Sequence, residues 1–170
     1  MIFKFLSKNF YISFSIVALI YFLDRLSKIY VIQLDKNNLG SDIFNSAYLN
    51  IVLIWNKGIA FGLLSFNESY LYNIISLIIA IIIIVLVIMS LKNLGFKRYS
   101  LLMIVGGALG NLHDRFFFNA VPDFIDFHIG NFHWFIFNVS DIFITLGVIS
   151  MIVFEIFDNK NEKKNNVKKY

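Results

Sequence analysis

The amino-acid sequence predicts an all-α membrane protein with four transmembrane helices, both termini in the cytoplasm, and a small extracytoplasmic β-element between the first two helices. Three observations carry this prediction. The 170 residues are 58% hydrophobic and 15% charged, whereas a soluble domain carries about 25% charged residues. Four apolar segments are long enough to cross a bilayer. The basic and acidic residues also divide between opposite ends of these segments.

The four predicted spans differ in how cleanly they are bounded. The segment 70–91 contains no charge and is long enough for a hydrocarbon core of ~30 Å. The segments 99–118 and 134–157 are apolar over comparable lengths. In the first segment, about 10–31, the apolar run before Asp24 is as short as a signal-peptide core. No cleavage site follows and the helical pattern continues, so we expect a retained helix.

The charge distribution predicts the orientation and the organisation of the chain. Basic segments stay on the cytoplasmic side of a membrane, and the basic residues gather near the N-terminus, in the 92–99 loop and in the C-terminal tail. Most acidic residues lie toward the other side. We therefore expect both termini inside. The prediction is a single membrane domain over 1–158, followed by a basic cytoplasmic tail over 159–170.

The outer segment between the first two spans, about 35–69, has the composition of a β-element. Its stretch "AYLNIVLIWN" is rich in β-branched and aromatic residues, and "NKGIAFG" supplies turn residues. We expect a small β-element that rests on the outer membrane surface.

Polar residues gather at the outer ends of the predicted spans. Charged groups at membrane depth are costly unless paired, so they are candidates for a functional site. Asp24 and Lys28 lie one helical turn apart, with the acid N-terminal to the base. Asn111, Asp114 and Arg115 share one face at the end of the third span. Each set is also compatible with a structural ion pair, and Arg115 could instead hold a backbone carbonyl group of a substrate.

Two aspartates suggest catalysis more directly. Asp123 follows the third span in a short loop constrained by Pro122, and Asp141 lies near the start of the fourth span. If the loop folds back, the two carboxyl groups would share a proton. One is then an acid and the other a base, the arrangement that activates water in aspartic proteases. Asp126 competes for this role, but its aromatic neighbours favour a position at the membrane interface.

Other kinds of site are less well supported by the sequence. The chain has no cysteine, which excludes thiolate nucleophiles and disulfides. His113, His128 and His133 lack the spacing of a common zinc motif, and the last two stand among aromatic residues typical of a membrane interface. We therefore expect no metal and no cofactor. No nucleic-acid-binding motif accompanies the basic segments, so no nucleic-acid partner is expected.

Five motifs occur in one order along the chain: "DRLSK", "WNKGIAFGLL", "GGALGNLHDR", "VPDFIDF" and "FNVSDIFI". Together, over about 10–157, they resemble lipoprotein signal peptidase (signal peptidase II), a family of bacterial membrane aspartic proteases. The resemblance implies that Asp123 and Asp141 are the catalytic pair. It also implies that further residues line the pocket, orient the pair or hold the substrate. These supporting residues are Asp24, Lys28, Asn56, Gly58, Asn111, Arg115 and Asn138.

The resemblance further implies what the protein acts on. Members of this family remove signal peptides from diacylglyceryl-modified prolipoproteins and cut just before the lipidated cysteine. The expected partners are these prolipoproteins and membrane lipids, and we expect a monomer. The expected location is the bacterial cytoplasmic (inner) membrane, with a site near its extracytoplasmic face. The alternative is a small membrane transporter or lipid-binding protein with an intramembrane polar site, which predicts paired charges on several helices but no loop aspartate facing a helix-start aspartate.

Overall fold

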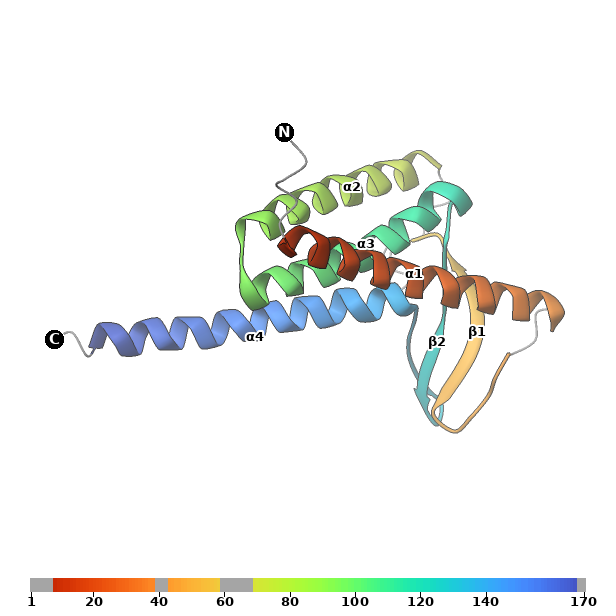
Figure 1. The fold of residues 1–170 in the computed structure, drawn as a ribbon. Helices are drawn as coiled ribbons and strands as arrows, with labels where there is room; N and C mark the ends of the chain where they lie inside the picture. The colour runs from red at the N-terminus through yellow and green to blue at the C-terminus, as the bar shows by residue number, and fades with distance from the viewer. Residues whose placement is uncertain (1–7, 39–42, 59–68, 168–170) are drawn as a thin grey trace, which may run out of the picture.

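The fold is a helical bundle with a small sheet at one end (Figure 1). The structure is a computed structural model and describes residues 8–38, 43–58 and 69–167. Within these ranges the chain runs through α1 (Lys8–Asn37), β1 (Leu49–Asn56), α2 (Ser69–Lys92), α3 (Gly95–Phe118), β2 (Val121–Ile129), β3 (Phe132–Phe137) and α4 (Val139–Val167).

Helix α3 is the centre of the bundle, because it packs against α1, α2 and α4. Glycines on α3 make this close packing possible. A methyl group added at Gly106 would lie 2.9 Å from Cβ of Ile20 on α1, and one at Gly107 would lie 2.5 Å from the carbonyl oxygen of Ser140 on α4. Small residues let helix backbones approach each other closely. As a result, α1 and α4 both pack closely against the middle of α3.

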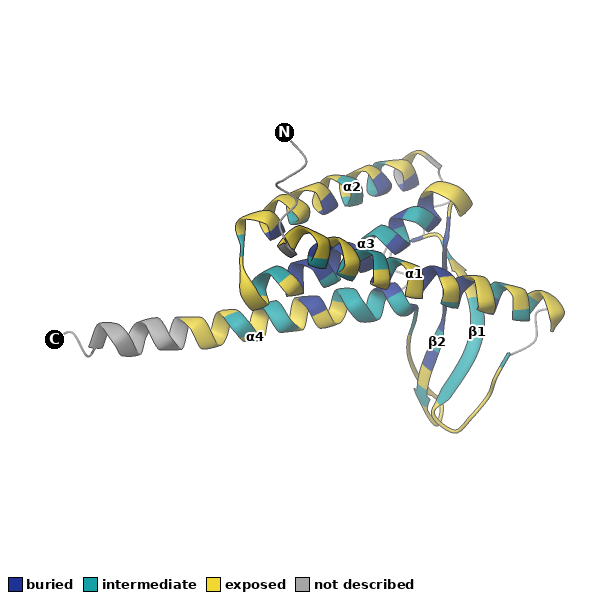
Figure 2. Cartoon of the chain, viewed as in Figure 1, coloured by how far each residue is buried: buried dark blue, intermediate teal, exposed yellow. Residues whose placement is uncertain are grey.

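Several charged side chains lie inside the bundle beside its apolar core, and many apolar side chains face outward. On α1, Asp24 and Lys28 are 0% exposed, whereas Phe22 and Leu26 are 59% and 64% exposed. Figure 2 shows the same exposed outer faces along α1, α2 and α4. Among the described residues, two helical stretches are long and apolar enough to cross a membrane by length and composition, Tyr72–Lys92 and Val139–Asp158.

The sheet is antiparallel, with strand order β1-β2-β3. It joins two distant parts of the chain, since β1 lies between α1 and α2 and the β2–β3 hairpin lies between α3 and α4. Asn56 of β1 stands opposite Val121 of β2. At the hairpin turn Gly130 adopts a φ of +58°, which a residue with a side chain rarely adopts. The register places the end of β1 beside the start of β2, next to the helix ends.

The predicted β-element between the first two helices is present as β1. The other two of the three strands come from the segment after α3 and were not predicted, and Asp123 lies in β2 rather than in a loop. The start of β2 is buried on both faces, so it lacks the alternation that marks a half-exposed strand. Because 132–137 pairs with β2, helix α4 begins at Val139 and not at 134. Parts of the predicted outer segment, 39–42 and 59–68, lie outside the described residues.

Candidate active site

A cleft of about 350 Å³ opens between the sheet and the parts of α3 and α4 that lie beside it. Most of its wall is apolar, including Ile79 of α2 and Ile144 and Val148 of α4. The polar part of its wall contains six of the predicted site residues: Asn56, Asn111, Arg115, Asp123, Asn138 and Asp141.

Asn138 joins the two aspartates. Its side-chain Nδ2 donates to Oδ1 of Asp123 at 2.6 Å. Its backbone N–H donates to Oδ2 of Asp141 at 3.2 Å, and the backbone N–H of Asp141 donates back to Oδ1 of Asn138 at 3.2 Å. This reciprocal pair is a capping box, in which the residue before a helix and the third helical residue satisfy each other's backbone N–H groups. The start of α4 therefore orients Asp141 and holds it near Asp123.

Asp123 is a buried carboxyl group, 4% exposed. Its second oxygen, Oδ2, accepts a hydrogen bond from Nδ2 of Asn56 at 2.9 Å. Burial, followed by the nearby charge of Asp141, raises the pKa of Asp123 from 3.8 to about 6, although the amide groups of Asn56 and Asn138 oppose this shift. Desolvation and a like charge both favour the neutral acid. Asp123 can therefore hold a proton at mildly acidic pH.

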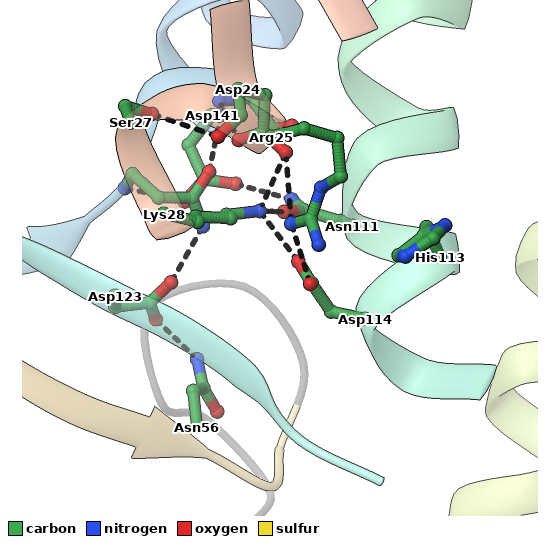
Figure 3. A network of polar contacts seen from close by, with 12 residues as sticks. Asp24, Arg25, Ser27, Lys28, Asn56, Asn111, His113, Asp114, Asp123 and Asp141 are labelled. Atoms are coloured by element: carbon green, nitrogen blue, oxygen red, sulfur yellow. Dashed lines mark hydrogen bonds and ion pairs between the residues drawn. The ribbon is translucent and has the colours of Figure 1, made fainter. Parts of the chain in front are cut away.

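Asn111 connects Asp141 to a buried group of charges (Figure 3). Its Nδ2 donates to Oδ1 of Asp141 at 2.8 Å, while its Oδ1 accepts from Nζ of Lys28 at 2.9 Å. Nζ of Lys28 also lies 2.7 Å from Oδ2 of Asp114 and 2.9 Å from Oδ2 of Asp24. The predicted pairing of Asp24 with Lys28 is thus present, and Asp114 joins it from α3.

Asp24 also reaches the start of α4. Its Oδ1 accepts the backbone N–H of Ser140 at 3.0 Å, where a negative charge is favoured by the free N–H groups of a helix N-terminus. A methyl group added at Gly110 would lie 2.5 Å from Oδ2 of Asp24. Only glycine therefore fits at this point, where α1, α3 and α4 converge.

Arg115 holds the turn that follows β1. Its Nη2 donates to the carbonyl oxygen of Gly58, and its Cζ lies 5.1 Å from the ring centroid of Tyr72, a cation–π contact. The same turn is closed from within, since the N–H of Gly58 donates to Oδ1 of Asn56 at 2.8 Å. The sequence left open whether Arg115 pairs with an acid or holds a backbone carbonyl group of a substrate. In the structure Arg115 contacts a backbone carbonyl group of its own chain.

Asp126, which the sequence predicts at the membrane interface, is buried within the protein, at 4% exposure. Nδ1 of His133 lies 2.9 Å from its Oδ2, and Nδ2 of Asn50 donates to the same oxygen at 3.3 Å. His113 is paired elsewhere, with its Nδ1 2.8 Å from the hydroxyl group of Tyr21. Within 8–38, 43–58 and 69–167, no group of three or more His, Cys, Asp or Glu side chains is arranged to hold a metal ion.

The sequence-based prediction omitted Arg25. Its Nη2 lies 2.5 Å from Oδ1 of Asp114 and 3.4 Å from Oδ2 of Asp24. The signal that could have identified it is its spacing of three residues from Lys28, which places both cations on one side of α1. The segment "DRLSK" therefore contributes one acid and two bases to the same buried group.

The comparisons with known proteins agree with the motifs. Residues 16–157 match the model of the family described as signal peptidase (SPase) II. The lipoprotein signal peptidase of Pelagibacter ubique (strain HTCC1062) is 48% identical over 158 residues, which are 93% of this chain and 95% of the relative. The lipoprotein signal peptidase of Anaplasma phagocytophilum (strain HZ) is 42% identical over 137 residues, 79% of this chain and 85% of the relative.

A solved structure is similar over most of the chain. It is a bacterial membrane enzyme determined by the in meso method at 2.3 Å resolution, with a TM-score of 0.71 and 31% sequence identity over 88% of this chain and 90% of that one. The family resemblance seen in the sequence is thus confirmed by the family model, by relatives over nearly their full length and by the fold. The chain belongs to the signal peptidase II family.

Proposed function

We propose that this protein is an aspartic endopeptidase that removes signal peptides from diacylglyceryl-modified prolipoproteins, cutting just before the lipidated cysteine. The observation that carries the proposal is the placement of Asp123 and Asp141 in one cleft, joined by hydrogen bonds to Asn138. The named relatives, which are lipoprotein signal peptidases, support the substrate class.

The proposed reaction uses the two carboxyl groups as an acid and a base. A water molecule between them gives a proton to the ionised carboxylate and attacks the carbonyl carbon of the scissile peptide bond. The protonated carboxyl group gives its proton to the carbonyl oxygen. When the tetrahedral intermediate collapses, the carboxyl group that took the proton from water gives it to the leaving nitrogen and the C–N bond breaks. A hydroxyl group of the intermediate returns its proton to the other carboxylate. Because the groups share one proton, Asp123 and Asp141 titrate as a pair.

The supporting residues are proposed to hold this pair in position. Asn56 and Asn138 donate to Asp123, and Asn111 donates to Asp141. Lys28 and Asp24 position Asn111 and the start of α4. Arg115 fixes the turn at Gly58 beside the cleft. Both carboxyl groups come from one chain, so we propose that a monomer is active. The apolar wall of the cleft suits a signal peptide, and lipid chains retained in the bilayer would anchor the substrate and preposition the scissile bond.

We further propose that all four helices span the bacterial cytoplasmic membrane, with both termini inside and the cleft near the extracytoplasmic face. Charges on α1 and α3 would otherwise be costly in lipid, but Asp24, Lys28 and Asp114 are buried against one another. The turn between α2 and α3 lies at the end of the bundle away from the sheet (Figure 1). The first helical turn of α3, which follows it, carries Lys97 and Arg98, as expected of a cytoplasmic helix end.

The test uses purified protein in detergent with a diacylglyceryl-modified prolipoprotein and its unmodified form, each with and without a chelator. Mass spectrometry should find cleavage just before the lipidated cysteine, only in the modified substrate, and at a rate that the chelator leaves unchanged. If the modified substrate stays intact, the proposed function is wrong and a transporter or lipid-binding role gains support. If the chelator abolishes cleavage, the protein is a metal-dependent peptidase instead.

A further inference from the structure

We propose that Arg25 is a positioning residue for Asp141, and that it acts through Asp114, Lys28 and Asn111. The inference rests on the proposed function, because it concerns the geometry of the same carboxyl pair. Arg25 does not line the cleft. Four contacts through three intermediate residues lead from Arg25 to Asp141, and each of these contacts is a hydrogen bond or an ion pair.

The side-chain amide of Asn111 is held in one orientation. Its oxygen accepts from Lys28 and its nitrogen donates to Asp141. An amide group presents a donor on one side and an acceptor on the other. A cation on the oxygen side therefore keeps the N–H side toward Asp141. If the amide turned over, its oxygen would face the carboxyl group, and the hydrogen bond that orients the carboxylate would be lost.

The charges around Lys28 are balanced. Asp24, Lys28 and Asp114 are each 0% exposed, and Arg25 is 9% exposed. Two acids thus face two bases in a region that water scarcely reaches, where unpaired charge is costly. With Arg25 present, each acid has two cationic partners. Lys28 can therefore bond both acids and still direct one N–H to Asn111.

Removing Arg25 would upset this charge balance. Lys28 would then be the only cation between two buried carboxylates, and its ammonium group would be drawn toward them. Of the three groups that Lys28 contacts, the Asn111 amide is the one without a charge. The hydrogen bond to Asn111 would therefore weaken first, since bonds between oppositely charged groups are stronger. The Asn111 amide would lose its fixed orientation, and Asp141 would be less well aligned with the scissile bond. Misalignment of this kind lowers kcat more than it raises KM.

Arg98 offers a matched control. It also links α3 to α1, since its Nη2 donates to Oγ of Ser13 at 2.6 Å and to the carbonyl oxygen of Asn9 at 3.1 Å. These contacts lie at the opposite end of the same two helices. Replacing either arginine with glutamine therefore removes one α1–α3 link and one positive charge. Only Arg25→Gln, however, disturbs the contacts that lead to Asp141.

The experiment measures kcat and KM with the modified prolipoprotein for Arg25→Gln, Arg25→Lys, Asp114→Asn, their Arg25→Gln/Asp114→Asn combination and Arg98→Gln. Arg25→Gln should lower kcat by about 10- to 100-fold, with KM within about twofold of the wild type. Arg25→Lys, which keeps the charge, should retain most of kcat, and Arg98→Gln should match the wild type. In the Asp114→Asn background, Arg25→Gln should add little, because contacting residues act non-additively.

A second measurement does not depend on activity. The Asn111 side-chain NH₂ group, observed by NMR in asparagine-labelled protein, should exchange its hydrogens faster in Arg25→Gln than in the wild type or Arg98→Gln. Equal exchange in all three proteins would overturn the proposal. So would equal kcat values for Arg25→Gln and Arg98→Gln, an effect confined to KM, or an Arg25→Gln variant that cannot be obtained folded. A wild type that exchanges slowly but leaves the substrate intact would contradict the proposed function alone.

Discussion

Asp123 and Asp126 lie three residues apart on β2 and are equally buried, at 4% exposure each, yet their surroundings differ. Successive side chains of a strand point to opposite faces, so an offset of three residues places the two carboxyl groups on opposite sides of the sheet. Asp123 faces the cleft and Asp141. Asp126 instead meets Asn50 and His133 from the neighbouring strands.

The difference lies in the partners and not in the burial. Nδ1 of His133 and Nδ2 of Asn50 contact Asp126 from the two neighbouring strands, so these side chains tie the three strands together. Asp123 accepts hydrogen bonds from the neutral amides of Asn56 and Asn138, and after burial it is the charge of another carboxylate, Asp141, that raises its pKa. A carboxyl group that faces a second one is poised to share a proton. The comparison therefore supports the proposed catalytic role on one side of β2 and a role in cohesion of the sheet on the other.

Replacing each aspartate with asparagine tests this comparison most strongly. Asp123→Asn and Asp141→Asn should each lower kcat for prolipoprotein cleavage by about 10³- to 10⁴-fold, because each removes one member of the acid–base pair. Asp126→Asn should keep kcat within about threefold of the wild type while lowering the temperature of unfolding. Turnover and thermal unfolding of the purified variants in detergent would measure both effects. An inactive Asp126→Asn beside an active Asp123→Asn would reverse the assignment.

Asn138 and Asn50, which hydrogen-bond Asp123 and Asp126 respectively, should differ in the same way but with a smaller effect on kcat. Asn138→Ala removes a donor to Asp123 and the cap that orients Asp141, so kcat should fall by about 10²- to 10³-fold. Asn50→Ala removes a donor to Asp126 and should destabilise the sheet by about 1 kcal/mol without a matching loss of kcat. Steady-state kinetics and denaturation curves of the two variants decide this. Equal losses of kcat would mean that the two sides of β2 are not separate in function.

The part of this site that depends on local spacing could be predicted from the sequence. Asp24 and Lys28 are one turn apart on a helix, so their pairing needs no knowledge of the fold. The motifs predicted that Asp123 and Asp141 would lie together, and both line one cleft. The helical segments could be predicted from their apolar length. The predicted ends of these helices were less accurate. Phe132–Phe137 is as apolar as the predicted fourth helix that follows it, but it pairs with β2 as strand β3.

The remainder depends on contacts between distant segments. β2 is buried on both faces at its start, so no alternation marks it, and its partner β1 lies before α2 in the chain. The opposite orientation of Asp123 and Asp126 could not be derived while both were expected in a loop. Arg25 is recognisable as part of the charge group only when α3 brings Asp114 beside it. Spacing indicates which residues share a face, but not which face a neighbouring helix covers.

The pH dependence of stability gives a further test of the difference between Asp123 and Asp126. Its pKa is raised from 3.8 to about 6 by burial and by the charge of Asp141, so between these pH values the folded protein binds a proton that the unfolded chain releases. The stabilisation is complete below pH ~4 and is lost as the pH rises through ~6, a change of about 3 kcal/mol. Denaturation in detergent at several pH values should show this loss in the wild type and in Asp126→Asn, where Asp123 remains, and a smaller loss in Asp123→Asn. A pH dependence that is unchanged in Asp123→Asn and weaker in Asp126→Asn would place the proton-sharing carboxyl group on the other face of β2.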